Sequence, residues 1–167
     1  MGAGKSTVGR LCAQRLDRPF VDVDELVEAT AHRPVAEIFA TDGEAAFRAL
    51  ERTALADACA SPQALVIACG GGAMGDADNR KRVRGDGCVV WLTADPATLA
   101  ARVGEGVARG QRPLLVGGDA PVATLERLAS LRAPAYAAAA HATVDTAGLA
   151  VDAVADRVLE EYARCGG

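Results

Sequence analysis

The first residues of the chain form part of a motif that binds phosphate groups. Gly4-Lys5-Ser6 matches the second half of the pattern G-x-x-x-x-G-K-[ST]. In such a loop, backbone N–H groups converge on phosphate oxygens, the lysine reaches the β- and γ-phosphates, and the hydroxyl holds Mg²⁺. Apolar residues recur at helical spacing from Thr7 to Leu16, which predicts a helix whose N-terminal end faces the anion. Residues 2–7 are therefore predicted to form a phosphate site.

Two carboxylates follow the next short apolar run, Pro19 to Asp24. This run predicts a strand, and open α/β sheets bind ligands at the carboxyl ends of their strands. If the strand continues to Asp24, the period of two places Asp22 and Asp24 on one side. One carboxylate could then hold Mg²⁺ and the other could accept a proton from an attacking hydroxyl. The alternative is that Asp24 caps the next helix.

Three consecutive glycines follow a second apolar run. Leu65 to Cys69 suits a strand buried on both faces, and Gly70, Gly71 and Gly72 come directly after it. Bare backbone N–H groups at that edge would make a cradle for an anion or a substrate hydroxyl. A plain tight turn is the alternative, although a turn rarely needs three glycines.

Arginine supplies nearly all the positive charge of the chain. Arg48 and Arg132, taken singly, are typical of solvated helix positions. Arg112 lies in a glycine-flanked segment, about residues 104–119, which is too polar for core and is predicted to be a mobile loop. A lid arginine that closes over transferring phosphates would neutralise charge and exclude water.

The elements that must position these residues alternate along the chain. Further strands are predicted at 88–92 and 142–145, and helices at 25–31, 34–39, 45–60, 77–83, 96–103, 121–140 and 151–162, with Asp42 and Asp95 as caps and Pro134 as an interruption. Alternating strands and helices predict an α/β fold in which helices sandwich a parallel sheet.

The composition of the chain limits the kinds of partner that it can bind. Its 167 residues suit one domain, residues 1–167, and the net charge of −4 argues against nucleic acid or a membrane surface as the main partner. No apolar run approaches the roughly 20 residues of a membrane span. The five scattered cysteines predict reduced thiols in a cytosolic protein. His32 and His141 lack neighbours at ligand spacing and are assigned to no metal.

Taken in order, these features resemble the shikimate kinase family over essentially the whole length from Gly2 onward. The matching pattern comprises Gly2 to Thr7, Asp22 and Asp24, Ile38 to Glu44 with Phe47, Arg48 and Glu51, Gly70 to Gly72, Arg112 to Leu115, and Arg132 to Tyr136. The resemblance implies a P-loop fold similar to that of nucleoside monophosphate kinases, with substrate-binding helices at about 23–60 and a lid at about 104–119. It also implies transfer of the ATP γ-phosphate to the 3-hydroxyl of shikimate, in aromatic amino-acid biosynthesis.

The resemblance also assigns roles to single residues. Gly2, Ala3, Gly4, Lys5, Ser6 and Thr7 would bind ATP, with Mg²⁺ on Ser6 and, through water, on Asp22. Asp24 would bind the shikimate hydroxyls and is the candidate base. Arg48, oriented by Glu51, and Arg132 would hold the substrate carboxylate beside Gly70, Gly71 and Gly72. Arg112 would act from the lid and Arg102 would pack against adenine. We expect a cytoplasmic monomer.

The chain departs from the family pattern in two places. The first loop glycine and the strand before it would lie upstream of Met1. That strand should be central, so its absence leaves unpaired backbone on two neighbouring strands, and each buried unpaired group costs roughly 1–3 kcal/mol. We expect this chain to be poorly stable or weakly active unless residues precede Met1. The segment Ala147-Gly148-Leu149 also lacks the proline that some members place against adenine.

Two rival functions remain open at this point. A related small-molecule kinase, such as a gluconate kinase, would share the loop and the lid. It should not need Arg48 and Arg132 together with the glycine cradle. A shikimate-kinase-like regulatory domain that has lost catalysis would be expected to lose Lys5, Asp24 or Arg112, and all three are present.

Overall fold

The strands form two separate parallel pairs. The computed structural model describes residues 2–107 and 121–166. Within these ranges β1 (Phe20–Asp22) pairs with β2 (Val66–Ala68), and Phe20 lies opposite Val66. In the second pair β3 (Val90–Thr93) lies beside β4 (Ala142–Asp145), with Val90 opposite Ala142. The predicted parallel α/β architecture is confirmed, and the expected break in the centre of the sheet is confirmed as well, since β2 and β3 are not paired.

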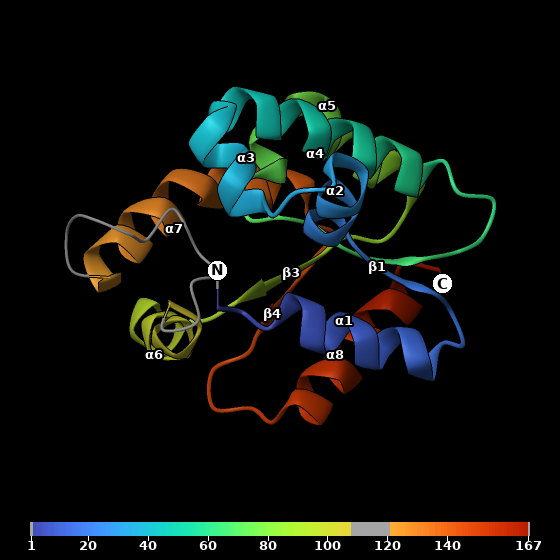
Figure 1. Ribbon diagram of the computed structural model, residues 1–167. Helices are drawn as coiled ribbons and strands as arrows, with labels where there is room; N and C mark the ends of the chain where they lie inside the picture. Colours follow the sequence, from blue (N-terminus) through green and yellow to red (C-terminus); the bar gives the residue numbers. More distant parts are fainter. Residues whose placement is uncertain (1, 108–120, 167) are drawn as a thin grey trace.

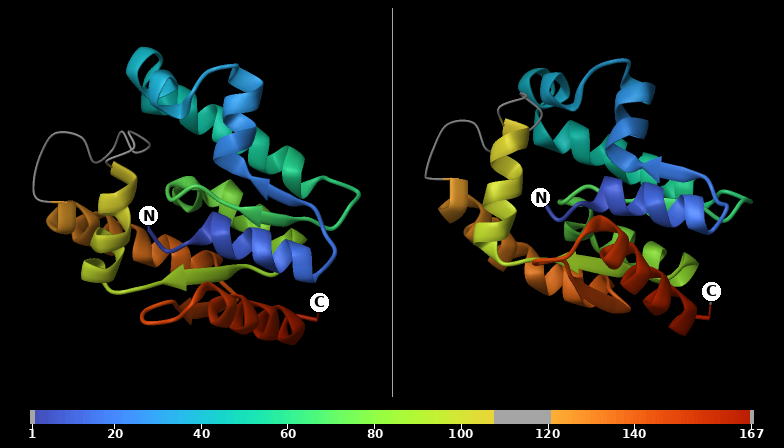
Figure 2. Two further views of the ribbon diagram at one scale, coloured as in Figure 1. Left: turned by 60° about the horizontal axis from the view of Figure 1, so that its bottom comes forward. Right: turned by 90° about the horizontal axis from the view of Figure 1, so that it is seen from below.

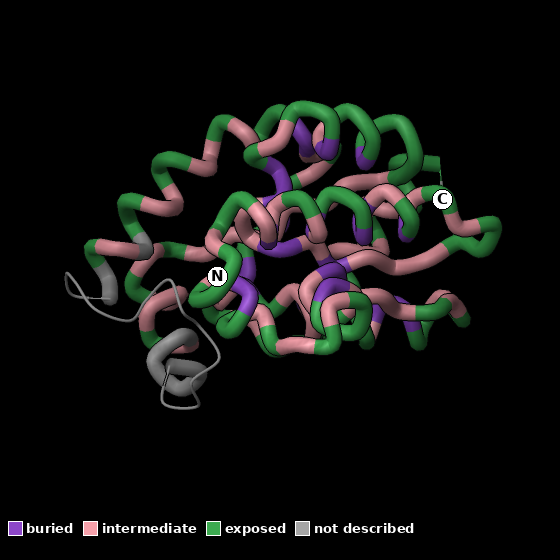
Figure 3. The backbone as a smooth tube through the Cα atoms, turned by 45° about the horizontal axis from the view of Figure 1, so that its top comes forward, coloured by how far each residue is buried: buried purple, intermediate pink, exposed green. Residues whose placement is uncertain are grey.

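Helices cover both faces of these strands (Figures 1 and 2). On one face α1 (Lys5–Arg15) packs against α8 (Val151–Arg164). The opposite face is covered by α4 (Gly43–Cys59), α5 (Ala77–Asp86) and α7 (Pro121–Ala139). The remaining elements are α2 (Val23–Ala31), α3 (Val35–Thr41), the 3₁₀ turn η1 (Ala73–Gly75) and α6 (Pro96–Val107). Figure 3 shows the buried positions on the inward-facing sides of the helices.

Aspartates fix where several helices begin. Asp22 ends β1 and caps α2, because its Oδ1 accepts a hydrogen bond from the Asp24 N–H at 3.1 Å. Asp76 caps α5 in the same way, and Asp95 accepts bonds from the Thr98 N–H and hydroxyl before α6. The prediction that the first strand reaches Asp24 is therefore wrong, since the cap turns the chain into a helix at Val23.

Three other expectations about the elements need correction. Pro134 lies inside α7 and does not end it, because the helix is held by packing against α5 and η1. Residues 104–107 belong to α6 and not to a loop, whereas the rest of the proposed lid lies outside the described residues. Asp42 precedes α4 but makes no side-chain cap; its carboxylate pairs with Arg33 instead.

Two apolar clusters lie on either side of the strands. The larger joins α2, α3, α4, α5 and α7 around Ile38 and Leu55, and the smaller joins α1, α8 and β4 around Val8 and Val144. Between β2 and β3 the two clusters are separated by a cavity of about 550 Å³. The predicted loss of a slab of core at the centre of the sheet is therefore present in the structure.

The cysteines are not all free. Cys88, two residues before β3, and Cys165, directly after α8, form a disulfide, with Cα atoms 5.9 Å apart. The prediction of five reduced thiols is wrong for this pair, because the fold brings together residues 77 positions apart. Cys12, Cys59 and Cys69 carry free thiols. Among the described residues, no helix has the length and apolar character needed to cross a bilayer.

Candidate active site

The phosphate loop has the backbone geometry that its motif predicts. Gly4 is the N-cap of α1 and adopts a left-handed conformation, φ 81° and ψ 19°, which a glycine takes without strain. The Ser6 hydroxyl donates a hydrogen bond of 2.6 Å to Asp22 Oδ2. The start of α1 and the carboxyl end of β1 therefore meet, and the positive end of the helix dipole lies at the same place.

Asp24 lies in the first turn of α2, beside this loop. Its Oδ1 is buried and has no hydrogen-bond partner in the protein. Burial raises the pKa of Asp24, and the charge of Asp22 raises it further, whereas Lys5 and Arg48 lower it. A buried carboxylate oxygen without a partner, placed among charged groups, has the character of a proton acceptor at a functional site.

Arg48 is held by two carboxylates of its own helix. Its Nη1 donates to Glu51 Oε2 at 2.6 Å, and its Nε and Nη2 donate to Glu44 Oε1 at 3.2 and 3.1 Å. Glu51 is only 1% exposed, and its Oε1 has no partner. Burial raises the pKa of Glu51 and the charge of Asp24 adds to this, although Arg48 and Arg132 oppose it. The two carboxyl groups and the two guanidinium groups therefore form one electrostatic cluster.

The glycines after β2 allow the backbone to approach this cluster closely. A Cβ atom on Gly70 would collide with Glu51 Oε1 and would lie 2.8 Å from Asp24 Oδ1. A Cβ atom on Gly72 would collide with the guanidinium of Arg48, 2.6 Å from Nη1. Glycine is needed here because the side chains of Asp24, Glu51 and Arg48 occupy the space that a side chain would fill.

Helix α7 contributes the remaining polar groups. The Tyr136 hydroxyl donates a hydrogen bond to the Gly71 carbonyl and so ties α7 to the glycine run. Burial raises the pKa of Tyr136, and the neighbouring Arg132 guanidinium lowers it. Arg132 and Tyr136 also line a small cavity, of about 70 Å³, together with Ala3 of the phosphate loop. Arg132 thereby lies near both the loop and Glu51.

The comparisons with known proteins agree on one family. The family model for shikimate kinase matches residues 1–163. A shikimate kinase of Symbiobacterium thermophilum is 47% identical over 99% of this chain and 94% of its own length. A shikimate kinase of Dechloromonas aromatica is 41% identical over 98% of this chain and 87% of its own length.

Solved structures give the same result. The Acinetobacter baumannii shikimate kinase in complex with shikimate superposes with a TM-score of 0.89 and 36% identity, over 96% of this chain and 87% of that one. The Aquifex aeolicus shikimate kinase superposes with a TM-score of 0.80 and 28% identity, over 96% of this chain and 90% of that one. The chain belongs to the shikimate kinase family. As a member of that family it is an ATP-dependent kinase.

The structure brings together most of the residues that were predicted from the shikimate kinase pattern, as expected for a member of this family. Their side chains or backbone meet at one edge of the strands: Lys5, Ser6, Asp22, Asp24, Arg48, Glu51, Gly70, Gly72 and Arg132. Arg102 lies apart from them, where its guanidinium donates to the Thr146 hydroxyl at 2.8 Å and the Thr146 carbonyl at 2.9 Å, after β4. Arg112 lies outside the described residues.

Two residues of the matching pattern, Glu44 and Tyr136, received no role from the sequence although they contact the candidate site. Glu44, one turn before Arg48 on α4, accepts from its Nε and Nη2, and Tyr136 holds the Gly71 carbonyl. The spacing i, i+4 between Glu44 and Arg48 could have revealed the first contact. No spacing in the sequence could have revealed the second, because it joins residues 65 positions apart.

Replacing Gly70 by alanine is expected to lower kcat/KM for shikimate at least tenfold. The added methyl group would displace Asp24 and Glu51 from each other and from their place beside the phosphate loop. Gly75→Ala is the matched control, because a Cβ atom there meets nothing within 4 Å. Steady-state kinetics of the two variants at saturating ATP would test this. Equal activity of both variants would contradict the close-approach role of Gly70.

Proposed function

We propose that the chain transfers the γ-phosphate of ATP to the 3-hydroxyl of shikimate, giving shikimate 3-phosphate in aromatic amino-acid biosynthesis. The observation that carries the proposal is the position of Asp24, a buried carboxylate subject to the charges of both Lys5 and Arg48. Lys5 would bind the phosphates and Arg48 the substrate, and Asp24 would then be the proton acceptor between the two reactants.

The substrate carboxylate would bind to Arg48 and Arg132. A planar guanidinium offers paired N–H donors that match a carboxylate. Glu51 and Glu44 hold Arg48 in one orientation before substrate arrives, which lowers the entropy lost on binding. The backbone of Gly71 and Gly72 would donate to the same ligand, with Gly71 positioned by Tyr136.

Asp24 would orient the attacking hydroxyl and accept its proton as the phosphoryl group is transferred. Its Oδ1 has no partner in the protein and so keeps an acceptor for a substrate hydroxyl. Lys5, at the positive N-terminal end of α1, would neutralise charge on the transferring phosphate. Arg112 is proposed to add a second positive charge from the lid.

Ser6 and Asp22 fit a site for Mg²⁺. A hydroxyl and a carboxylate are hard oxygen ligands, and they lie 2.6 Å apart beside the phosphate loop. The described residues hold no cluster of three or more His, Cys, Asp or Glu side chains that could bind a metal. Mg²⁺ does not need one, since it keeps several waters and uses one or two carboxylates together with substrate phosphates. When bound, the ion would supply charge neutralisation at the phosphate oxygens.

The proposal is tested by ADP release from Mg-ATP with and without shikimate. We expect release to depend on shikimate and the product to be phosphorylated at the 3-hydroxyl, as read by phosphorus NMR. Gluconate is the matched control substrate, because it carries a carboxylate and hydroxyls on a flexible chain. Turnover with gluconate but not with shikimate in a folded protein would overturn the substrate assignment. Binding of shikimate without turnover would favour a regulatory domain.

The pH dependence of kcat/KM for shikimate is expected to show an acid limb above the ordinary aspartate pKa of 3.8. Burial and Asp22 raise the pKa of Asp24 in the folded protein, and only the ionised carboxylate can accept a proton. Activity should therefore be lost as the pH falls through this raised pKa. Nucleotide binding measured at the same pH values is the control. A rate that stays constant down to pH 4, with binding intact, would exclude Asp24 as the base.

The proposal places the kinase in the cytoplasm as a monomer that acts on small molecules and binds neither nucleic acid nor membrane. The net charge of −4 and the small-molecule character of the site support this proposal. In a reducing cytoplasm the Cys88–Cys165 pair would be exposed to the thiol pool of the cell.

A further inference from the structure

The three glycines after β2 form a β-turn. The Ala73 N–H donates to the Gly70 carbonyl at 3.2 Å, so Gly71 and Gly72 are the two central residues. Gly72 has φ −105° and ψ −12°, and φ is not positive at Gly71. In a type I turn the second central residue lies near about −90° and 0°, whereas type II requires a φ of about +80° there. The turn is therefore of type I.

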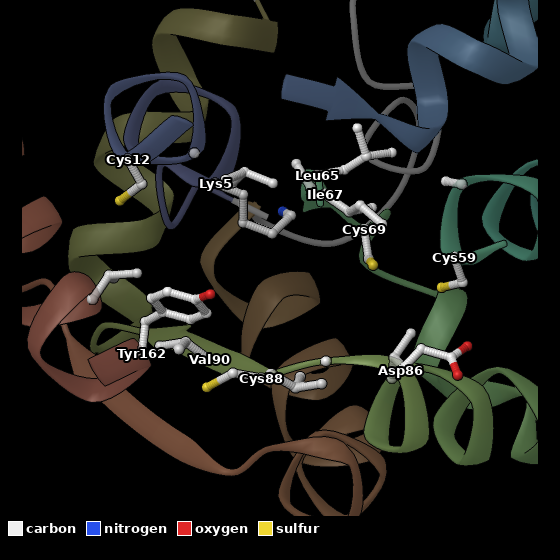
Figure 4. Close-up of a pocket in the computed structure, with 18 of the residues that line it drawn as sticks. Lys5, Cys12, Cys59, Leu65, Ile67, Cys69, Asp86, Cys88, Val90 and Tyr162 are labelled. Atoms are coloured by element: carbon white, nitrogen blue, oxygen red, sulfur yellow. The ribbon is translucent and has the colours of Figure 1, made fainter. Parts of the chain in front are cut away.

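This turn lies at the edge of the strands that carries the phosphate loop. Cys69, the residue before the turn, lies near Lys5 in the cavity between β2 and β3 (Figure 4). Gly72 lies against Arg48, since a Cβ atom on this glycine would be 2.6 Å from Nη1. The turn thus borders both the phosphate loop and the proposed binding site for the substrate carboxylate.

Glycine at position 72 leaves the type of this turn open. Rotation of the peptide that joins Gly71 to Gly72 by about 180° converts type I into type II, and type II requires glycine or asparagine at the second central position. A residue with a larger side chain would keep the turn in type I. The guanidinium of Arg48, however, occupies the space that such a side chain would fill. The orientation of this peptide therefore depends on contacts with the rest of the fold.

Tyr136 of α7 supplies such a contact. Its hydroxyl donates to the Gly71 carbonyl, and its ring packs against Trp91 of β3 with the ring centroids 5.4 Å apart. Because the peptide bond is trans, the Gly72 N–H points away from the Gly71 carbonyl and hence away from Tyr136. No described residue accepts a hydrogen bond from this N–H, and Gly72 is only partly buried. The donor is therefore available to a ligand.

We propose that Tyr136 positions this donor for the substrate. Its hydroxyl holds the turn in type I, so that the Gly72 N–H and the Arg48 guanidinium donate to the same carboxylate. After a flip to type II, the Gly71 carbonyl would take the place of the N–H and would repel that carboxylate. This role rests on the proposed binding of shikimate at Arg48, and Tyr136 performs it through the peptide, without touching the substrate.

The variant Tyr136→Phe tests this role, because it removes the hydroxyl and keeps the ring that packs against Trp91. We expect KM for shikimate to rise about tenfold, the effect of losing a hydrogen bond to a charged group. We expect kcat and KM for ATP to change less than about twofold, since the lost contact acts on substrate binding alone. Unchanged Trp91 fluorescence would verify that the ring keeps its place.

Tyr162→Phe is the matched control. Tyr162 is the other tyrosine of the chain and lies on α8, where its hydroxyl accepts a hydrogen bond of 2.6 Å from Arg18 Nη1. This variant loses the same chemical group away from the glycine turn. It should leave KM for shikimate unchanged.

NMR reads the turn itself without any substrate. In type I the N–H protons of Gly71 and Gly72 lie close together, whereas in type II the Gly72 N–H lies close to an Hα of Gly71. We expect a strong N–H to N–H NOE in the wild type and in Tyr162→Phe. In Tyr136→Phe this NOE should weaken, and the NOE from the Gly72 N–H to the Gly71 Hα should grow.

Retention of the type I pattern in Tyr136→Phe would overturn the proposal. An unchanged KM for shikimate, a loss confined to kcat, or an equal rise of KM in Tyr162→Phe would overturn it as well. The NOE pattern separates this proposal from the proposed function. A folded wild-type protein that ignored shikimate would overturn the substrate assignment, whereas a change of the pattern in Tyr136→Phe would still show that Tyr136 sets the turn.

Discussion

Asp24→Asn is expected to lower kcat for shikimate phosphorylation by about 10²–10⁴-fold, the usual effect of removing a general base. The amide keeps the shape of the side chain but cannot accept the hydroxyl proton. Shikimate affinity should change much less, because we propose that Arg48 and Arg132 hold the substrate carboxylate independently. Steady-state kinetics together with shikimate titration by calorimetry would separate the two effects.

The stability of Asp24→Asn distinguishes a catalytic role from a structural one. Burial raises the pKa of Asp24, so the folded protein binds this proton more tightly than the unfolded chain does. The ionised carboxylate therefore lowers stability at pH values above its raised pKa, and asparagine should leave Tm unchanged or higher. Glu25→Gln is the matched control, because Glu25 is the next residue of α2 and is 60% exposed. A kcat close to wild type in Asp24→Asn would exclude the base assignment.

The members of the site could be predicted from the sequence, but their mutual contacts could not. Gly4, Lys5 and Ser6 could be identified from the sequence because the loop motif consists of consecutive residues. The contact of Arg48 with Glu51 follows from i, i+3 spacing on one helix. The need for glycine at position 70 depends on Asp24 and Glu51, which lie 46 and 19 positions earlier, and local patterns carry no information about such distances.

The same distinction between local patterns and contacts of distant residues explains which predictions about the elements were wrong. The sequence predicts a strand through Asp24, because the alternation of apolar and acidic residues continues to that position. The Asp22 carboxylate instead bonds the Asp24 N–H and starts α2. Pro134 removes a helix hydrogen bond locally, yet tertiary packing of α7 against α5 and η1 outweighs that loss. The strands themselves were predictable, because each apolar run is bounded by turn residues, but their pairing was not.

Arg48→Ala is expected to impair both substrate binding and stability. Loss of the charged hydrogen bonds to the shikimate carboxylate should raise KM for shikimate about 10–100-fold. The same change leaves Glu51, which is 1% exposed, without its cation. Removing one partner of a buried ion pair costs about 3–5 kcal/mol of unfolding free energy, although protonation of Glu51 offsets part of this because its pKa is already raised. Urea unfolding and shikimate kinetics would measure the two losses.

The double variant Arg48→Ala/Glu51→Gln separates these two losses. A neutral amide at position 51 carries no buried charge, so stability should recover relative to Arg48→Ala alone, whereas KM should stay high because no guanidinium has been restored. Arg52→Ala is the matched control, since Arg52 lies one turn further along α4, is 51% exposed and pairs with Asp76 at the surface. It should change stability by about 1 kcal/mol or less. Recovery of KM in the double variant would show that Arg48 acts by holding Glu51 in place and not by binding the substrate.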